Sequence, residues 1–137
     1  MIRMLGAMVE ASDRAQQLAG TLEARLVEAR NRAKCLPRRP RVFFEEWDDP
    51  LISGIGWISE LVEIAGGIDI FADRASQGAA SQGAAKDRVV TTDEVVAREP
   101  DLIIGSWCGK KFRPERVITR PSFEQIPSCA ARRRVRD

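Results

Sequence analysis

Three tryptophans are the residues of this sequence best suited to hold a ligand. Trp47 follows the apolar run at residues 42–44, Trp57 follows a glycine-bearing turn, and Trp107 follows the run at residues 101–106. An indole ring offers a wide flat surface with a polar N–H at its rim. Ligands of α/β proteins usually lie at the carboxyl ends of strands, so this placement favours binding through aromatic contact. Trp57 fits a core position equally well, whereas Trp47, flanked by acids, is expected to be exposed.

Covalent catalysis and metal binding have little support in the sequence. The chain has no histidine, which removes most general-base and metal-ligand schemes. Cys35, Cys108 and Cys129 are odd in number and scattered, so they suit neither a disulfide framework nor a zinc site. Two lysines after Cys108 would favour its thiolate, but a thiol enzyme also needs a base. We therefore predict no catalytic residue, no metal site and no enzyme activity.

Two further patterns have a structural interpretation beside a functional one. Thr91 and Glu94 have the spacing of a capping box, and Asp93 joins Glu94 in the first turn of the expected helix. Acids at that position suit the helix dipole, whatever else they do. The turn at residues 53–56 exposes backbone N–H groups that could hold an anion. Its Gly-Ile-Gly matches neither a P-loop nor a dinucleotide fingerprint, so we interpret it as a hinge into a helix.

Length and charge limit the classes of protein to which the chain can belong. Its 137 residues correspond to one domain with a modest core. The net charge is +2, yet residues 41–108 carry 13 acidic and 5 basic side chains between two basic ends. That distribution does not suit a nucleic-acid-binding surface. No apolar run is long enough for a membrane span, and the first residues do not form a secretory signal, so the chain as written is expected to stay in the cytoplasm.

A long helix is expected to precede the tryptophans. Apolar residues recur at steps of three and four across residues 2–34, no proline interrupts them, and Pro37 marks the end. A single helix of that length would be about 50 Å long at roughly 1.5 Å per residue. Periodicity alone leaves two interpretations open, a coiled-coil or bundle helix and a rod between two lobes.

The remaining elements predict an α/β lobe with a small, mostly parallel sheet flanked by helices. We expect buried strands at residues 41–46 and 101–106, a turn at Asp49-Pro50 and a helix that ends before Gly66-Gly67. Residues 68–73 suit a short connection or an edge strand, and the tandem repeat SQGAA at residues 76–85 suits a loop. Short helices are expected at residues 93–98 and 113–119.

Four stretches of the chain carry a family resemblance. They are the long helix, RVFFEEWDDPLISGIGW, ELVEIAGGIDIFAD and AAKDRVVTTDEVVAREPDLIIGSW. Together they resemble the cobalamin and iron-chelate substrate-binding proteins of ABC importers, in which one long rigid helix joins two α/β lobes. The stretch EEWDDPLISGIGW is most similar to members assigned to cobalamin.

The resemblance implies a role for each part of the chain. Residues 1–37 would be the inter-lobe helix and residues 38–137 the C-terminal lobe. The transported ligand, cobalamin or an iron chelate, would contact Trp47, Trp57 and Trp107 in the cleft, with no intrinsic cofactor. Asp93, with Glu94 beside it, would dock against arginines of the membrane permease. The protein would then act in the periplasm.

The chain departs from the family pattern in ways that add expectations. It lacks an N-terminal lobe, an export signal and the strand and helix that follow the last motif, so it is expected to be a truncated relative. One wall of a cleft should bind a large corrinoid weakly. The alternative function is an interaction module, in which the long helix pairs two copies of the chain or holds a separate N-terminal lobe.

Overall fold

The computed structural model describes residues 1–76, 84–127 and 129, and the chain divides into two compact units. The first is Met1–Pro37 and the second is Arg38–Asp137. In the described part of the chain, no helix has the length and apolar character that a membrane crossing requires.

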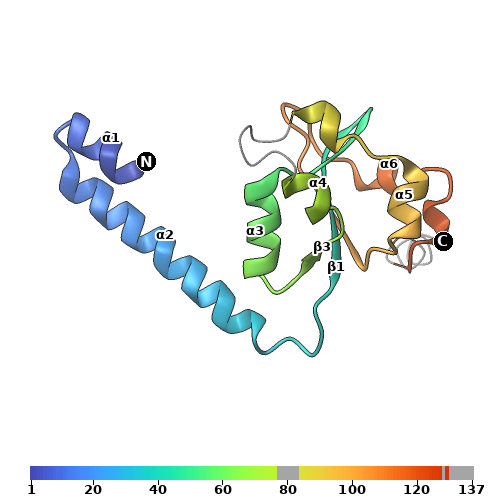
Figure 1. Ribbon diagram of the computed structural model, residues 1–137, viewed down its shortest axis with the longest axis horizontal. Coiled ribbons are helices and arrows are strands. Elements are labelled where there is room, and N and C mark those ends of the chain that lie inside the picture. The colour runs from blue at the N-terminus through green and yellow to red at the C-terminus, as the bar shows by residue number, and fades with distance from the viewer. Residues whose placement is uncertain (77–83, 128, 130–137) are drawn as a thin grey trace. The chain divides into compact units, whose positions relative to one another are not determined.

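The first unit is a pair of helices rather than the single helix that periodicity predicts. Helix α1 (Ile2–Met8) is followed by α2 (Ser12–Ala33), and the chain reverses between them at Glu10, whose φ is +53°. The two helices pack where Gly6 meets Ala15, since a Cβ on Gly6 would lie 2.2 Å from that of Ala15. Small residues therefore allow a close crossing that apolar spacing does not reveal. Figure 1 shows α1 folded back on α2.

The long N-terminal helix itself is confirmed in α2, which has 22 residues and a length of about 33 Å at roughly 1.5 Å per residue. A bidentate ion pair joins the two helices, with Arg3 Nη1 and Nη2 lying 2.8 and 3.0 Å from the carboxylate of Glu23. Only three residues of the unit are buried, namely Gly6, Ala15 and Ala19.

The second unit is built on β1 (Arg41–Asp48). Strand β3 (Ile68–Asp69) pairs in parallel with its first residues, and β4 (Leu102–Gly105) pairs in parallel with residues 42–45. The mostly parallel sheet predicted from the sequence is confirmed. One strand was not predicted: β2 (Leu51–Ser53) returns antiparallel along the end of β1. Three residues between two turn signals carry too little alternation to indicate a strand.

Short helices surround the sheet (Figure 1). They are α3 (Gly56–Ile64), α4 (Ala72–Ser76), α5 (Thr92–Ala97) and α6 (Pro114–Ile118), with 3₁₀ turns η1 (Ala85–Arg88) and η2 (Phe123–Gln125). Helix α3 ends as expected, because Gly66 has a φ of +87°, a value that favours glycine. The predicted loop at the SQGAA repeat lies largely outside the described residues.

The core of the second unit is aromatic at its centre. Phe43 of β1 meets Phe71 edge-on with ring centroids 5.6 Å apart. The residues buried with them are Leu51, Ile70, Val90, Val95, Trp107, Val117, Ile118, Phe123, Ile126 and Cys129. Strand β4 is less buried than predicted, since Leu102 and Ile104 are exposed while Ile103 packs on the core. Only one face of β4 is therefore covered.

Candidate functional site

The register of the sheet brings three segments to one edge. Strands β1 and β4 run in parallel, so Trp47 and the residues after Gly105 lie at the same, carboxyl, edge. Strand β2 pairs with the end of β1, and α3 begins three residues after β2, so the first turn of α3 lies at this edge too. We call this region the carboxyl edge; it contains Trp47, Asp48, Trp57 and Lys110.

Trp57 is the open aromatic residue of the carboxyl edge. It is the second residue of α3 and is 56% exposed, so it contributes little to the core. Leu61 lies one turn further along α3 and is also exposed. Of the two interpretations left open by the sequence, the exposed position is the one that the structure shows.

Trp47 is half-buried and held in one orientation. Its indole Nε1 donates a hydrogen bond of 2.9 Å to the carbonyl oxygen of Asp49. The Lys110 ammonium lies 3.9 Å from the ring centroid, within the range of a cation–π contact. The ring is therefore fixed between its own hairpin and the loop after β4.

Trp107 lies in the core and is 5% exposed. Its Nε1 donates to Glu45 Oε1 at 2.7 Å, and its ring meets Phe112 edge-on at 5.1 Å. Its position after a strand was the basis for predicting a ligand contact. The structure instead places it beneath the edge, where it packs and orients Glu45.

Glu45 is a buried carboxylate that sequence analysis overlooked. Besides Trp107, it accepts two hydrogen bonds from Arg120, at 2.5 Å from Nη1 and 2.7 Å from Nη2. The Glu45 side chain is fully buried, and that of Arg120 is 14% exposed. An acid that follows the apolar run Val42–Phe44 was the available signal, but its partner is 75 residues away in the sequence. This pair ties the segment after α6 to the central strand.

Asp48 forms ion pairs with two cations at the carboxyl edge. Its Oδ1 accepts a hydrogen bond of 3.1 Å from Lys110 Nζ, and its Oδ2 lies 2.9 Å from Arg116 Nη1. Burial acts to raise the pKa of the Asp48 carboxyl, but Lys110, a backbone hydrogen bond and, less strongly, Arg116 together hold that pKa below its ordinary value. Asp48 is thus a carboxylate at neutral pH. From the sequence, Lys110 stands out only as a neighbour of Cys108.

Cys108, two residues before Lys110 in the sequence, is exposed. Among residues 1–76, 84–127 and 129, no group of three or more histidine, cysteine or acidic side chains could hold a metal ion. The arrangement at the carboxyl edge offers aromatic surface, hydrogen-bond donors and positive charge. Those groups can bind a ligand without making or breaking a bond.

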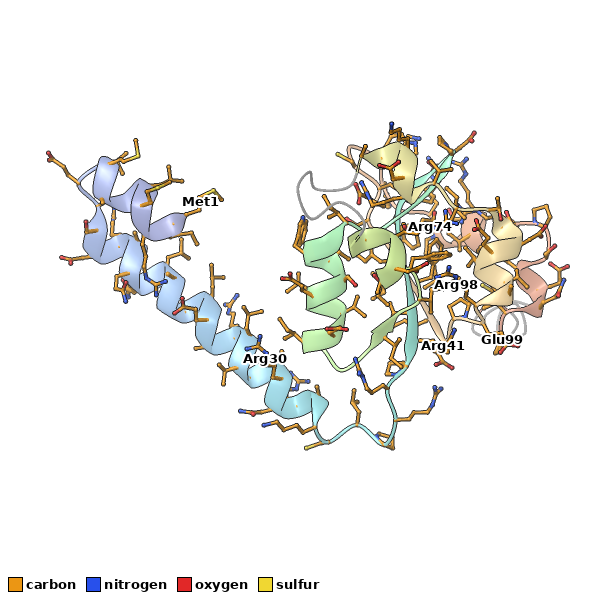
Figure 2. The ribbon with its side chains drawn as sticks, viewed as in Figure 1. Met1, Arg30, Arg41, Arg74, Arg98 and Glu99 are labelled. Carbon is orange, nitrogen blue, oxygen red and sulfur yellow. The ribbon has the colours of Figure 1, made fainter. Side chains whose placement is uncertain are left out.

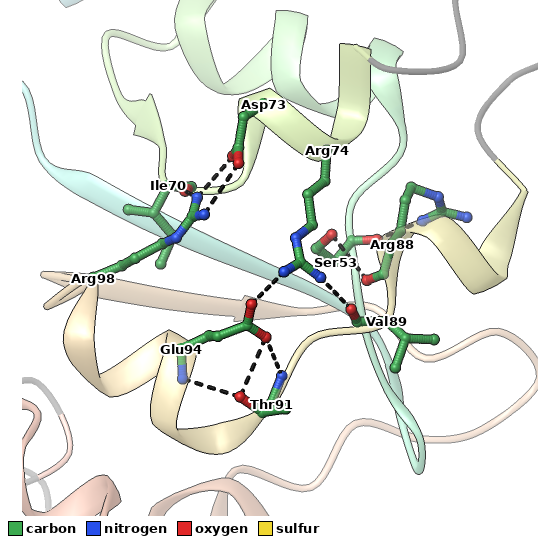
Figure 3. Close-up of polar contacts among 9 residues, drawn as sticks. All are labelled: Ser53, Ile70, Asp73, Arg74, Arg88, Val89, Thr91, Glu94 and Arg98. Carbon is green, nitrogen blue, oxygen red and sulfur yellow. Dashed lines mark hydrogen bonds and ion pairs between the residues drawn. The ribbon is translucent and has the colours of Figure 1, made fainter.

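The two acids of α5 differ in their surroundings, and Figure 3 shows the partners of Glu94. The capping box is confirmed: Thr91 N donates to Glu94 Oε2 at 2.7 Å, and Glu94 N donates to Thr91 Oγ1 at 3.2 Å. The other oxygen of Glu94 pairs with Arg74 of α4. The Thr91 backbone and, less strongly, Arg74 hold the pKa of Glu94 below its ordinary value despite some burial. Asp93, by contrast, is exposed.

A second ion pair holds the other end of α5. Arg98 donates from Nη1 and Nη2 to the carboxylate of Asp73, at 2.7 and 3.0 Å, and lies 4.4 Å from the Phe71 ring centroid. Arg41, at the start of β1, donates to the Arg98 carbonyl at 3.0 and 2.8 Å; Figure 2 labels both residues. Helix α5 is too short to be stable alone, so these contacts set its orientation.

Comparisons with known proteins agree with this architecture. A family model described as periplasmic binding protein matches residues 1–137. Comparison with curated protein sequences gives no significant match.

Several solved structures are similar in fold to this chain. A possible iron-binding (periplasmic solute-binding) protein from Staphylococcus epidermidis matches with a TM-score of 0.73 and 17% identity, over 96% of this chain and 49% of that one. The periplasmic heme-binding protein RhuT from Roseiflexus sp. RS-1 gives 0.72 and 20% over the same shares. The heme complex of S. aureus IsdE gives 0.67 and 18%, over 96% and 50%. This chain therefore spans about half the length of those structures.

Proposed function

The chain belongs to the periplasmic binding protein family. On that premise we propose that it is part of the substrate-binding component of an ABC import system for cobalamin or a related metal chelate. The observation that carries the proposal is the pair of indoles at the carboxyl edge of the sheet, the exposed Trp57 and the half-buried Trp47. Wide aromatic faces suit a macrocycle or another large chelate.

Two findings support the chelate class. RhuT is described as heme-binding and IsdE was solved in complex with heme, which is a metal chelate. The stretch around Trp47 and Trp57 resembles that of cobalamin-binding members, which favours a corrinoid within that class. We assign ligand contact to Trp47 and Trp57. We assign Trp107 a supporting role, because its indole orients Glu45 below the edge.

The same proposal gives the exposed acid of α5 a partner. Asp93 would meet arginines of a membrane permease, while Glu94 keeps the helix capped and paired to Arg74. Binding would take place outside the cytoplasmic membrane, without bond chemistry.

Two titrations of the whole chain test the proposal. Binding of cyanocobalamin would be followed by NMR through the indole N–H signals of a ¹⁵N-labelled sample, and binding of hemin would be followed by absorbance. We expect the Trp57 signal to shift and Trp57→Ala to weaken binding about tenfold, as for loss of an aromatic anchor. Leu102→Ala is the matched control, because Leu102 is also exposed but lies at the start of β4. No response to either chelate up to millimolar concentration would contradict the proposal.

A second candidate function is pairing through the helical unit. Large apolar side chains of α1 and α2 are exposed there, namely Met4, Leu5, Met8, Leu18, Leu22 and Val27. Surfaces of this kind mark interaction sites. Multi-angle light scattering tests it: a stable dimer that Leu18→Gln dissociates would support pairing, and a monomer at high concentration would contradict it.

A further inference from the structure

Two cations share a single carboxylate beside Trp47. Lys110 and Arg116 both approach Asp48, whose side chain is 2% exposed, while their own side chains are 45% and 56% exposed. Lys110 reaches Asp48 from the loop after β4, and Arg116 reaches it from α6. The carboxylate is thus inside and the cations face outward. A molecule that approaches this part of the carboxyl edge meets positive charge.

The three groups leave one positive charge uncompensated. Asp48 is ionised at neutral pH, as the lowered pKa of its carboxyl indicates. Lys110 directs one of its contacts to Asp48 Oδ1, and an ammonium has three donors. A guanidinium has five donors, and Arg116 has Asp48 as its carboxylate partner. Both cations therefore have donors to offer a second carboxylate.

The cations also lie next to an aromatic surface. The Lys110 ammonium sits over the Trp47 ring at 3.9 Å, and the same ring belongs to the ligand contacts proposed above. A ligand that touches Trp47 thus brings its periphery within reach of Lys110 and Arg116. Charge-assisted hydrogen bonds to a carboxylate are about twice as strong as neutral ones.

We propose that Lys110 and Arg116 form a recognition site for a carboxylate on the periphery of the ligand, so that the chain prefers an acid-bearing chelate to its amidated or esterified counterpart. The inference rests on the proposed function, because it concerns a ligand already in contact with Trp47. It goes further by naming the charge of the ligand and two residues that select it.

Matched chelates test this preference. Cyanocobalamin would be compared with its monocarboxylate derivative, in which one side-chain amide is an acid, by the indole N–H titration. Hemin would be compared with hemin dimethyl ester by absorbance. We expect the acid form of at least one pair to bind about tenfold more tightly, as one charge-assisted contact would provide. Lys110→Gln and Arg116→Gln should each reduce that ratio toward one, and Lys110→Arg should restore it.

Lys111→Gln is the control, since Lys111 is the exposed neighbour of Lys110 and contributes the same net charge. It should leave the ratio unchanged, and thermal melts would show that each variant is folded. Equal binding of acid and neutral forms by the native chain would overturn the inference while leaving the proposed function in place. A preference that survives both glutamine substitutions, or that Lys111→Gln also removes, would overturn it as well. Failure of all four compounds to bind would refute the proposed function and the inference with it.

Discussion

At the scale of single residues, acids on one strand have very different roles. Glu45 is fully buried against Arg120, Glu46 pairs with Arg88, and Asp48 is shared by Lys110 and Arg116. Each of these β1 acids joins the strand to a segment distant in the sequence. In the sequence they form a simple acidic run before a turn, and nothing in their spacing indicates the distant cations with which they pair.

Glu45 should be the most sensitive of these positions. Glu45→Gln would leave the Arg120 guanidinium buried without a charged partner, and breaking such a pair costs about 3–5 kcal/mol of unfolding free energy. Urea unfolding monitored by tryptophan fluorescence measures this loss. Glu60→Gln, an exposed acid on α3, is the control and should leave the midpoint almost unchanged. A loss below about 1 kcal/mol for Glu45→Gln would show that Arg120 is satisfied by other partners.

At the scale of elements, α5 shows how a six-residue helix is placed. Adjacent residues of α4 with opposite charge, Asp73 and Arg74, pair with Arg98 and Glu94 at the two ends of α5. Charge complementarity therefore fixes one short helix against another. The capping box was evident from spacing, but the cross-helix pairs join residues 20 and 25 positions apart and need the fold.

Substitutions of the two neighbouring acids of α5 should affect two different properties, association with the permease and stability of the fold. Asp93→Ala should leave the unfolding midpoint nearly unchanged and weaken association with the permease, because the side chain is exposed. Glu94→Ala should instead cost about 1 kcal/mol of stability, since it removes half of the capping box and the Arg74 pair.

Thermal melts and surface plasmon resonance on reconstituted importer would measure the two effects. Thr91→Ala serves as the control for α5, because it removes the cap without changing charge. Unchanged association on loss of Asp93 would contradict its docking role.

At the scale of the whole second unit, burial and ion pairing shift the pKa values of acids in opposite directions. Asp69 is buried at the end of β3, and loss of hydration together with the charge of Asp73 raises the pKa of its carboxyl. Asp101, before β4, accepts 2.6 and 2.9 Å hydrogen bonds from Arg38 and another from the Arg41 backbone. These bonds lower the pKa of Asp101 to about 2.

The two acids should therefore change the pH dependence of stability with opposite signs. The raised pKa of Asp69 favours folding when the group is protonated, and this contribution is lost as pH rises through the folded-state pKa. The lowered pKa of Asp101 stabilises the fold above the unfolded value near 4, and that contribution is lost as pH falls toward about 2.

Asp69→Asn should consequently raise the thermal midpoint at neutral pH, whereas Asp101→Asn should lower it there and make the acid limb shallower. Melts of both variants between pH 2 and pH 8 would measure these changes, roughly spanning the two transitions. A fall in the neutral midpoint for Asp69→Asn would mean that its carboxylate is satisfied when charged.

Local sequence pattern alone determined much of the secondary structure of this protein. Period, turn residues and caps predicted the long helix, the central strand, the end of α3 at Gly66 and the capping box of Thr91, because each depends on residues within a few positions of one another. Motif resemblance added the family, which the match over residues 1–137 confirms.

Tertiary structure decided what depends on distant partners. It interrupted the first helix at Glu10, packed Gly6 against Ala15, and placed Trp107 in the core. It also left Trp57 exposed. It also placed Lys110 and Arg116 around Asp48, although they are 62 and 68 positions away in the sequence. Burial and pairing of a side chain are properties of the packed unit, so no local spacing could have revealed them.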